Sequence, residues 1–457
     1  MSARGGQSRT AGRHRWLRWL GRFVLVLFLI GCGWGLYVVA GPGPLDFAGG
    51  HLASLGTQGI TDPSGVPAAL KEASSIEKGA YLARAADCVV CHTAPDGVAY
   101  AGGLALTTPL GTIYSTNITP DPETGIGQYS DQQFLDAVRR GIRRDGAYLY
   151  PAMPYPSYSY MSDGDVLAIK AYLSSLKPVR SATQPNALAF PFNHRRLVAF
   201  WNAFFSPNKR FEVNTDRDAQ WNRGAYLAEA LAHCGDCHTP RTAFYSLNNR
   251  KKFSGETLSG WRAYNASQDQ DSGIGSWSPD DLRNYLSTGH ANGRGTASGP
   301  MGDVVDESLS YLVPEDIAAL TAYLKTIPAA KSEDAPIQTT IASTSAPHDE
   351  SARSSGALIF AGSCAGCHGW NGQNPALPMA DLIGSRAVND SSGINVVNII
   401  VRGGQHHPRE STSTMPAFVE TYTNAEIADV ANFVTARYGR AGSHVTAAGV
   451  EQLRRFQ

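Results

Sequence analysis

The stretch His233-Cys-Gly-Asp-Cys-His-Thr-Pro-Arg241 has two cysteines separated by two residues and followed directly by a histidine. The same Cys-x-x-Cys-His spacing recurs at residues 88–92 and 364–368. Two thiols so spaced can add to the two vinyl groups of a haem, and the adjacent histidine can reach the iron. One copy could also be half of a zinc site or a redox dithiol, but three copies predict covalent haem attachment. The predicted attachment points are Cys88, Cys91, Cys234, Cys237, Cys364 and Cys367, with His92, His238 and His368 as iron ligands.

A helix-like segment precedes each motif and carries a glycine and an aromatic residue. Glycine in a helix costs about 1 kcal/mol relative to alanine, so its presence asks for a physical reason. A second segment follows each motif at a distance and has apolar residues at i, i+3, i+4 and i+7, the stripe of an amphipathic helix. We expect the glycine to allow the two helices to approach closely, and the aromatic residues Tyr172, Tyr323 and Phe433 of the second helix to pack in a core. The opening segments are 78–82, 223–227 and 355–360, and the closing segments are 166–173, 317–324 and 427–434.

Between motif and closing helix, each unit contains a predicted middle helix. Ser130 and Ser278 are suitable N-caps for the first two, and Pro279 suits a first helical turn. The middle helices are predicted over 132–140, 280–287 and, with a poorer match, 395–401. Capping boxes are expected where two closing helices begin, at Ser162 with Asp165 and at Thr423 with Glu426.

The chain therefore repeats one all-α unit three times. Units one and two also share a loop, 117–127 and 265–275, of which unit three keeps only Gly393-Ile394, so the first two are the closer pair. The predicted boundaries are 1–22 basic cytoplasmic segment, 23–40 transmembrane anchor, 41–72 tether, 73–180 unit one, 181–215 apolar linker, 216–330 unit two, 331–354 flexible linker, 355–440 unit three and 441–457 tail.

The sixth iron ligand decides whether a haem is closed or open to small molecules. Methionine closes the site and raises the reduction potential, whereas an open iron binds peroxide, oxygen or carbon monoxide. Met153, Met301 and Met415 stand at matching places between the middle and closing helices, each beside a proline, which restrains the local backbone. Their recurrence predicts three closed irons. The alternative ligands are Met161, Met379, His406 and His407, which we expect to have other roles.

Residues 23–40 carry no charge and, as a helix, would be about 27 Å long, close to the thickness of a bilayer's hydrocarbon. Arginines crowd the preceding segment, which favours a cytoplasmic N-terminus. Two other interpretations of this segment compete with a membrane anchor: a cleaved signal peptide, and a lipoprotein signal with Cys32 as the lipidated residue. The apolar run continues past Cys32 to Ala40, which favours the uncleaved anchor. The chain carries 39 basic and 39 acidic residues, so bulk charge indicates no nucleic-acid partner.

The linker 181–215 is strongly apolar and contains Phe192, Phe200, Trp201, Phe204 and Phe205. The simpler interpretation is a helix packed on or between the haem units. The alternative is a docking surface for a partner or for the membrane face.

Three further stretches, Tyr114-Ser-Thr-Asn-Ile-Thr-Pro120, Leu149-Tyr-Pro-Ala-Met-Pro-Tyr155 and Gly273-Ile-Gly-Ser-Trp277, join the haem motifs in a recognisable pattern. The chain resembles, over about residues 73–440, the triple-haem cytochrome c subunit of bacterial membrane-bound dehydrogenases that oxidise alcohols, aldehydes, gluconate or fructose. The resemblance implies three consecutive cytochrome c domains after an N-terminal transmembrane helix, and haem attachment in the periplasm. It also implies the axial pairs His92/Met153, His238/Met301 and His368/Met415.

By the same resemblance, a separate catalytic subunit oxidises the substrate and these haems pass its electrons to ubiquinone in the cytoplasmic membrane. We therefore expect no catalytic residue on this chain. The N-terminal anchor and the segment 192–205 look most like the aldehyde dehydrogenase branch, whose catalytic subunit carries molybdopterin beside an iron–sulfur subunit. A quinoprotein or flavoprotein partner is the alternative. Two other functions remain open from the residues alone: a peroxidase with one open iron, and a free-standing cytochrome that feeds a terminal oxidase.

Overall fold

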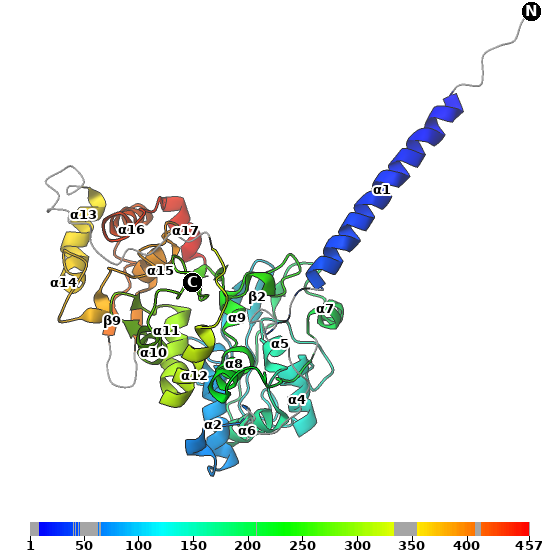
Figure 1. Cartoon of the computed structure of the whole chain (residues 1–457), viewed down its shortest axis with the longest axis horizontal. Coiled ribbons are helices and arrows are strands. Elements are labelled where there is room, and N and C mark those ends of the chain that lie inside the picture. The colour runs from blue at the N-terminus through cyan, green and yellow to red at the C-terminus, as the bar shows by residue number, and fades with distance from the viewer. Residues whose placement is uncertain are drawn as a thin grey trace, which may run out of the picture.

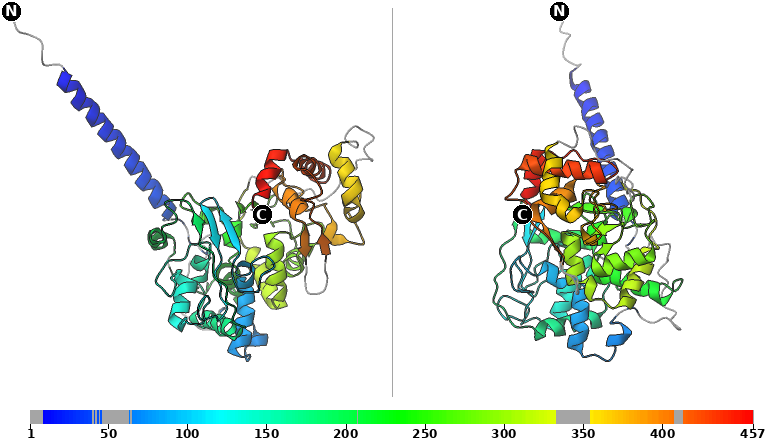
Figure 2. Two further views of the ribbon diagram at one scale, coloured as in Figure 1. Left: turned by 180° about the vertical axis from the view of Figure 1, so that it is seen from behind. Right: turned by 90° about the vertical axis from the view of Figure 1, so that its left-hand side faces the viewer.

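The computed structural model of the chain describes residues 9–39, 41, 43, 45, 63, 65–206, 208–332, 354–406 and 413–456. The predicted tether and the predicted flexible linker lie largely outside these residues, as does His407. Figure 1 shows one long helix that projects from a body, and Figure 2 shows the same arrangement from two other sides.

The projecting helix is α1 (Arg9–Val39), which takes in much of the basic segment as well as the predicted apolar run. Its apolar part, Trp16–Val39, is 24 residues long. At 1.5 Å per residue this part measures about 36 Å, which exceeds the ~30 Å hydrocarbon thickness of a bilayer. Length and composition therefore suit a membrane anchor, and Cys32 lies exposed on its surface.

Each unit is built on a crossed pair of helices that brackets its haem motif. The opening helix of each pair begins at a serine or aspartate N-cap, Ser74, Asp218 or Ser354, whose side chain accepts a backbone N–H. The pairs are α2 (Ser75–Ala85) with α6 (Asp163–Ser175), α8 (Ala219–Tyr226) with α12 (Pro314–Leu324), and α13 (Ser355–Ile359) with α16 (Asn424–Tyr438).

The predicted role of the repeated glycine is confirmed at all three crossings. A Cβ at Gly79 would lie 1.8 Å from the carbonyl oxygen of Ala168, and one at Gly224 would lie 1.9 Å from that of Ala319. At Gly356 the corresponding distance is 2.2 Å. Only a residue without a side chain lets the two backbones meet this closely.

The middle helices are α4 (Asp131–Arg140), α10 (Pro279–Thr288) and α15 (Ile394–Arg402), each within two residues of its predicted bounds. Ser130 and Ser278 form capping boxes, and Thr423 forms the predicted box with Glu426. The shorter helices are α3 (Cys88–Cys91), α5 (Tyr155–Tyr158), α7 (Val198–Phe205), α9 (Gly235–His238), α11 (Pro300–Glu307), α14 (Ala365–His368) and α17 (Ala447–Arg454).

The fold is not purely helical, as an all-α class would require, because short antiparallel strands brace the loops. The strands are β1 (Ala105–Thr108), β2 (Gly111–Tyr114), β3 (Ala187–Leu188), β4 (Glu256–Leu258), β5 (Trp261–Ala263), β6 (His290–Ala291), β7 (Gly295–Thr296), β8 (Gly404–His406) and β9 (Ser413–Met415). They form one three-stranded sheet, β1-β2-β3, and three hairpins, β4-β5, β6-β7 and β8-β9. In the last hairpin Gly404 pairs with Met415, so the strand register holds a predicted iron ligand.

The first two units share one continuous hydrophobic core, whereas unit three has a core of its own. Units one and two therefore form a fused pair, beside which unit three is built on its own core. The segment expected to be a tail, 441–457, contains α17, whose Val450 is fully buried in the core of unit three.

Two matching buried contacts join units one and two. Tyr81 of α2 donates a hydrogen bond to Asp316 of α12 at 2.5 Å, and Tyr226 of α8 donates one to Asp165 of α6 at 2.5 Å. Each tyrosine comes from the opening helix of one unit and each aspartate from the closing helix of the other. This reciprocity relates the two units by an approximate two-fold axis. It also corrects the capping box expected at Ser162, because the carboxylate of Asp165 bonds to Tyr226 and to the Gly65 N–H instead.

Candidate haem sites

The three motif histidines are held in the same way. The Nδ1 atom of His92 lies 2.6 Å from the Thr116 carbonyl oxygen, and that of His238 lies 2.7 Å from the Tyr264 carbonyl oxygen. In unit three, His368 Nδ1 lies 2.5 Å from the Ala380 carbonyl oxygen. A carbonyl only accepts hydrogen bonds, so Nδ1 carries the proton and Nε2 keeps its lone pair. Each ring is thus oriented and presents Nε2 as a possible iron ligand.

Burial lowers the pKa of all three histidines, His92, His238 and His368, below the ordinary value, against the opposing effect of the carbonyl hydrogen bond. An imidazole with a lowered pKa is neutral at physiological pH, which is the form that binds a metal ion. The three sites therefore share tautomer and charge.

The motif cysteines lie on short helices beside these histidines. Burial raises the pKa of Cys88 and of Cys234 to about 12. Such thiols are protonated, whereas a zinc site needs thiolates gathered with further ligands. Across the described ranges, no group of three or more His, Cys, Asp or Glu side chains gathers to hold a metal ion.

The methionines separate into two kinds of environment. Met153, Met301 and Met415 are partly buried at the edges of the cores. Met161 is 0% exposed inside the shared core, which fits the packing role expected for it. Met379 lies in a turn next to Ala380, the residue that holds His368, so its turn is on the histidine side of that site.

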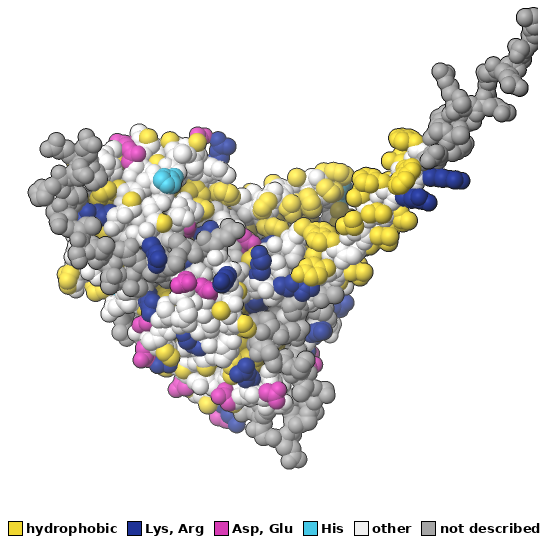
Figure 3. Space-filling view, turned by 45° about the horizontal axis from the view of Figure 1, so that its top comes forward, with side chains coloured by type: hydrophobic (Ala, Val, Ile, Leu, Met, Phe, Trp, Pro, Cys, Tyr) yellow, Lys and Arg dark blue, Asp and Glu magenta, His cyan; other side chains and the backbone are white. Residues whose placement is uncertain are grey.

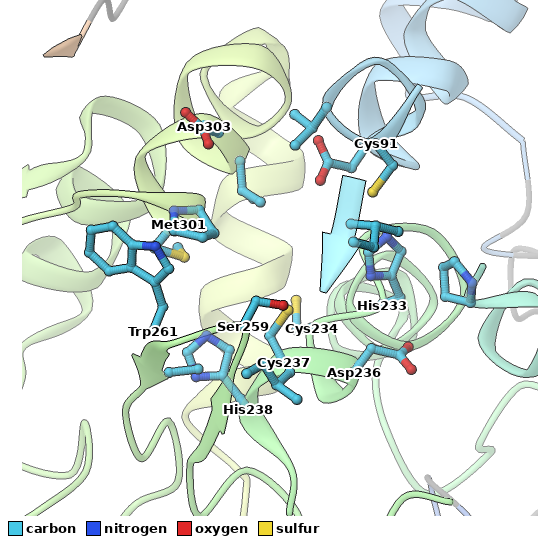
Figure 4. A pocket seen from close by; sticks show the side chains of 18 of the residues that line it. Cys91, His233, Cys234, Asp236, Cys237, His238, Ser259, Trp261, Met301 and Asp303 are labelled. Atoms are coloured by element: carbon cyan, nitrogen blue, oxygen red, sulfur yellow. The ribbon is translucent and has the colours of Figure 1, made fainter. Parts of the chain in front are cut away.

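A cavity of about 1700 Å³ lies between units one and two. Cys91 lines it from one side, and Cys234, Cys237, His238 and Met301 line it from the other (Figure 4). Its surface is mainly apolar, with Val90, Tyr100, Ile274, Leu286 and Leu320 among the lining residues. The cavity thus joins Cys91 of the first motif to Cys234, Cys237 and His238 of the second.

Buried donors on the cavity wall fit the polar edge of a haem. The Nε and Nη2 atoms of Arg402 and the Nε1 atom of Trp277 are buried without a hydrogen-bond partner among the described residues. Both residues line the cavity, and Arg402 lies 5.6 Å from the centre of the Trp261 ring. Buried donors require acceptors, and the two propionate carboxylates of a haem would supply them. Arg402 belongs to α15 of unit three, so the wall of this cavity is completed from the third unit.

Replacing Arg402 with methionine is expected to lower the reduction potential of the haem in unit two. Without the cation, the propionate charge is less compensated, which favours ferric over ferrous iron. We expect a fall on the order of 50 mV, close to the ~59 mV that makes a tenfold change in a one-electron equilibrium. Potentiometric titration followed by visible absorption measures the shift. Arg455→Met is the matched control, because Arg455 is exposed and pairs with Glu451 on the surface; equal shifts in both variants would contradict the assignment.

Reciprocal contacts also connect the two haem motifs. Ser157, four residues after Met153, donates a hydrogen bond to Asp236 inside the second motif at 2.7 Å. Conversely, α11, which contains Met301, packs against α3, which contains the first motif. The methionine side of each unit therefore touches the cysteine side of the other.

Unit three docks on strand β5, which leads to Tyr264, the residue whose carbonyl holds His238. The Asn395 side chain accepts a hydrogen bond from the Arg262 N–H and donates one to the Arg262 carbonyl, both at 2.9 Å. Asn398 donates to the Gly260 carbonyl at 2.7 Å. Arg262 lies two residues before Tyr264, whose carbonyl holds His238.

Sequence reasoning identified the motif histidines and the repeated methionines but missed the groups around them. Thr116 and Tyr264, whose carbonyls hold the histidines, directly precede Asn117 and Asn265, the first residues of the loop that units one and two share. The repeated loop in the sequence could therefore have indicated these two carbonyls. Arg402 had no such signal, because it reaches the cavity of unit two from another unit.

Comparison with known proteins assigns the family. A cytochrome c family model matches residues 76–177 and 354–436, which lie mostly in units one and three.

Curated relatives match a larger part of the chain. The fructose dehydrogenase cytochrome subunit of Gluconobacter japonicus is 37% identical over 425 residues, which cover 88% of this chain and 87% of that protein. The gluconate 2-dehydrogenase cytochrome c subunit of Pantoea cypripedii is 40% identical over 401 residues, which cover 83% of this chain and 89% of that protein. One of the nicotinate dehydrogenase subunits of Pseudomonas putida is 40% identical over 373 residues, which are 80% of this chain but 30% of that longer protein. The chain thus belongs to the family of cytochrome c subunits of dehydrogenase complexes, which carry covalent haem c and transfer electrons rather than act on the substrate.

Proposed function

We propose that the chain carries electrons from the catalytic subunit of a periplasmic dehydrogenase through three c-type haems to ubiquinone in the cytoplasmic membrane. The observation that carries this proposal is the threefold repeat of a Cys-x-x-Cys-His motif whose histidine donates Nδ1–H to a backbone carbonyl. Such a repeat offers positions for three irons along one chain.

The proposed iron ligands are His92 with Met153, His238 with Met301, and His368 with Met415. Cys88 and Cys91, Cys234 and Cys237, and Cys364 and Cys367 would form the thioether bonds. The bound haems would supply one-electron chemistry, and the protein's part is to fix their ligands, bury them and compensate their charge. Methionine on every iron would keep small molecules out, which distinguishes a carrier from a peroxidase.

The proposed location is the bacterial cytoplasmic membrane, with α1 as the anchor and the haem units in the periplasm. The arginines at the N-terminal end of α1 favour this orientation by the positive-inside rule. It places the haems where thioether attachment is completed in bacteria and beside the membrane pool of ubiquinone.

The proposed partner is a catalytic subunit with molybdopterin, accompanied by an iron–sulfur subunit, as in the aldehyde dehydrogenase branch. The similarity to a nicotinate dehydrogenase subunit and to fructose and gluconate dehydrogenase subunits leaves the substrate class to experiment. A quinoprotein or flavoprotein partner would use the same haem chain.

Purification of the tagged chain from detergent-solubilised membranes is expected to yield a catalytic subunit that mass spectrometry identifies. Candidate substrates are then added in turn: aldehydes, alcohols, gluconate, fructose and nicotinate. At least one of them should reduce the haems within the turnover time of the complex. Reduced haems should then be reoxidised by ubiquinone. A chain that purifies alone and is reduced by none of these substrates would contradict the dehydrogenase role and favour a free-standing cytochrome.

A further inference from the structure

Large aromatic side chains are exposed on the segment between units one and two. Phe190 is 79% exposed, Phe200 69% and Phe204 60%. Leu197, Phe192 and Phe244 are also exposed. We term these six residues the aromatic face. A soluble surface rarely gathers so many large apolar side chains without a ligand or partner.

The helix α7 is fixed on one side and exposed on the other. Val198 is buried, and Asn202 accepts a hydrogen bond from Tyr155 of unit one at 2.6 Å. The Trp201 indole donates to the Phe244 carbonyl at 2.8 Å. Phe200 and Phe204, four residues apart, lie on the same outer side of the helix. The exposure is therefore built into a well-held helix.

The aromatic face is continuous with the membrane anchor. The ring of Trp34 in α1 lies 5.5 Å from that of Phe244, which stacks on Phe205 of α7 at 5.9 Å. Arg250 fixes the same end of α1, because it lies 4.0 Å from the centre of the Tyr37 ring and donates to the Tyr37 carbonyl at 2.9 Å. Figures 1 and 2 show α7 beside the base of α1, and Figure 3 shows apolar side chains that continue from α1 onto the body.

The depth of Trp34 places this contact near the membrane boundary. The apolar part of α1 is about 36 Å long against a hydrocarbon thickness of ~30 Å. Trp34 lies five residues before Val39, the last residue of α1, or about 7.5 Å along the axis. With the ~36 Å span centred on the ~30 Å hydrocarbon, Trp34 lies about 4.5 Å inside the boundary with the headgroups, close to the layer that aromatic residues prefer, and Phe244 lies beside it.

Charge around the aromatic face suits an anionic membrane surface. No Asp or Glu occurs between Asp165 and Glu212, a stretch that contains Lys177, Arg180, Arg195, Arg196, Lys209 and Arg210. Arg196 and Lys209 are exposed at the two ends of α7. Basic residues beside an apolar helix face are the pattern of a helix that lies in the membrane interface.

We propose that the aromatic face is a second membrane contact, in which α7 lies in the interface of an anionic bilayer and holds unit one against the membrane. The contact fixes the distance between the haem units and the bilayer, which α1 alone would not do. Its occupant is lipid, and the catalytic partner binds elsewhere. The inference does not depend on which dehydrogenase the chain serves.

Photo-crosslinking in the full chain tests this proposal. The photoreactive residue p-benzoyl-phenylalanine is placed at Phe200 in one sample and, as matched control, at Leu358, an equally exposed apolar residue of α13 in unit three. The intact complex is irradiated in vesicles that contain phosphatidylglycerol, after its haem spectrum has been checked. We expect phospholipid adducts at position 200 in at least severalfold excess over position 358. Adducts of position 200 with the catalytic subunit, or equal lipid yields at both positions, would overturn the proposal.

A second measurement separates headgroup attraction from simple proximity. The yield of lipid adducts at position 200 should fall severalfold when Arg196 and Lys209 are both replaced with glutamine. The same fall is expected when phosphatidylglycerol is replaced with phosphatidylcholine. Substrate-dependent reduction of the haems should persist in these samples, so failure of the membrane contact and failure of the dehydrogenase role give different results. If the yield of lipid adducts is the same after both changes, the proposed contact with an anionic membrane surface is contradicted.

Discussion

Met301→Leu is expected to open the iron of unit two to carbon monoxide. Leucine keeps the volume of the side chain and removes the sulfur, so packing is largely preserved while the proposed sixth ligand is lost. Reduced protein with carbon monoxide should then show the difference spectrum of a five-coordinate haem. The reduction potential of that haem should fall by about 80 mV or more, which is a tenth of the ~0.8 V range that axial ligands span.

The matched control is Met379→Leu, because Met379 lies in the turn on the histidine side of its own site. We expect that variant to stay inert to carbon monoxide and to keep the potentials of the unchanged protein. Carbon monoxide binding by the unchanged protein would instead indicate an iron that is already open, as a peroxidase requires. Equal behaviour of the two variants would remove Met301 from the ligand set.

Gly356→Ala is expected to destabilise unit three by about 1–3 kcal/mol, the usual cost of overpacking a tight contact. The added Cβ would lie 2.2 Å from the carbonyl oxygen of Asp429 and 2.9 Å from the Cβ of Phe433. Neither atom can move without shifting α16. Urea unfolding followed by haem absorption measures the loss.

Gly362→Ala is the control from the same helical stretch, since a Cβ at Gly362 meets nothing within 4 Å. This second substitution should be neutral, or stabilise by up to about 1 kcal/mol through helix propensity. Equal losses at both positions would mean that the crossing of α13 and α16 does not depend on the glycine.

The repeated features of the fold followed from the sequence because they depend on local chemistry. A cap such as Ser130, a glycine such as Gly79 and an apolar stripe each carry their signal within one or two turns of chain. Their recurrence in the same order was enough to place motif, helix pair and methionine. Of the expected haem-binding residues, Cys91, Cys234, Cys237, His238 and Met301 line the cavity, and the ligand roles of all of them stay predictions.

What the sequence could not indicate depends on contacts between units. Asp165 has the spacing of a capping box, but its carboxylate bonds to Tyr226, which lies in another unit. Arg402 reaches a cavity whose haem motifs belong to the other two units. The strands of two to four residues are too short to show an alternating pattern. The short helix α17 has only two large apolar residues, and the packing of Val450 and Leu453 shows that it belongs to unit three.

The reciprocal pair Tyr81–Asp316 and Tyr226–Asp165 has a consequence for how the chain assembles. Each buried carboxylate takes one hydrogen bond from a tyrosine of the other unit, beside the Arg223 pair of Asp316 and the Gly65 N–H bond of Asp165. Each of these two units alone would lack a buried hydrogen bond and part of its apolar core. We therefore expect units one and two to unfold as one cooperative block, and unit three, with its separate core, to unfold independently of them.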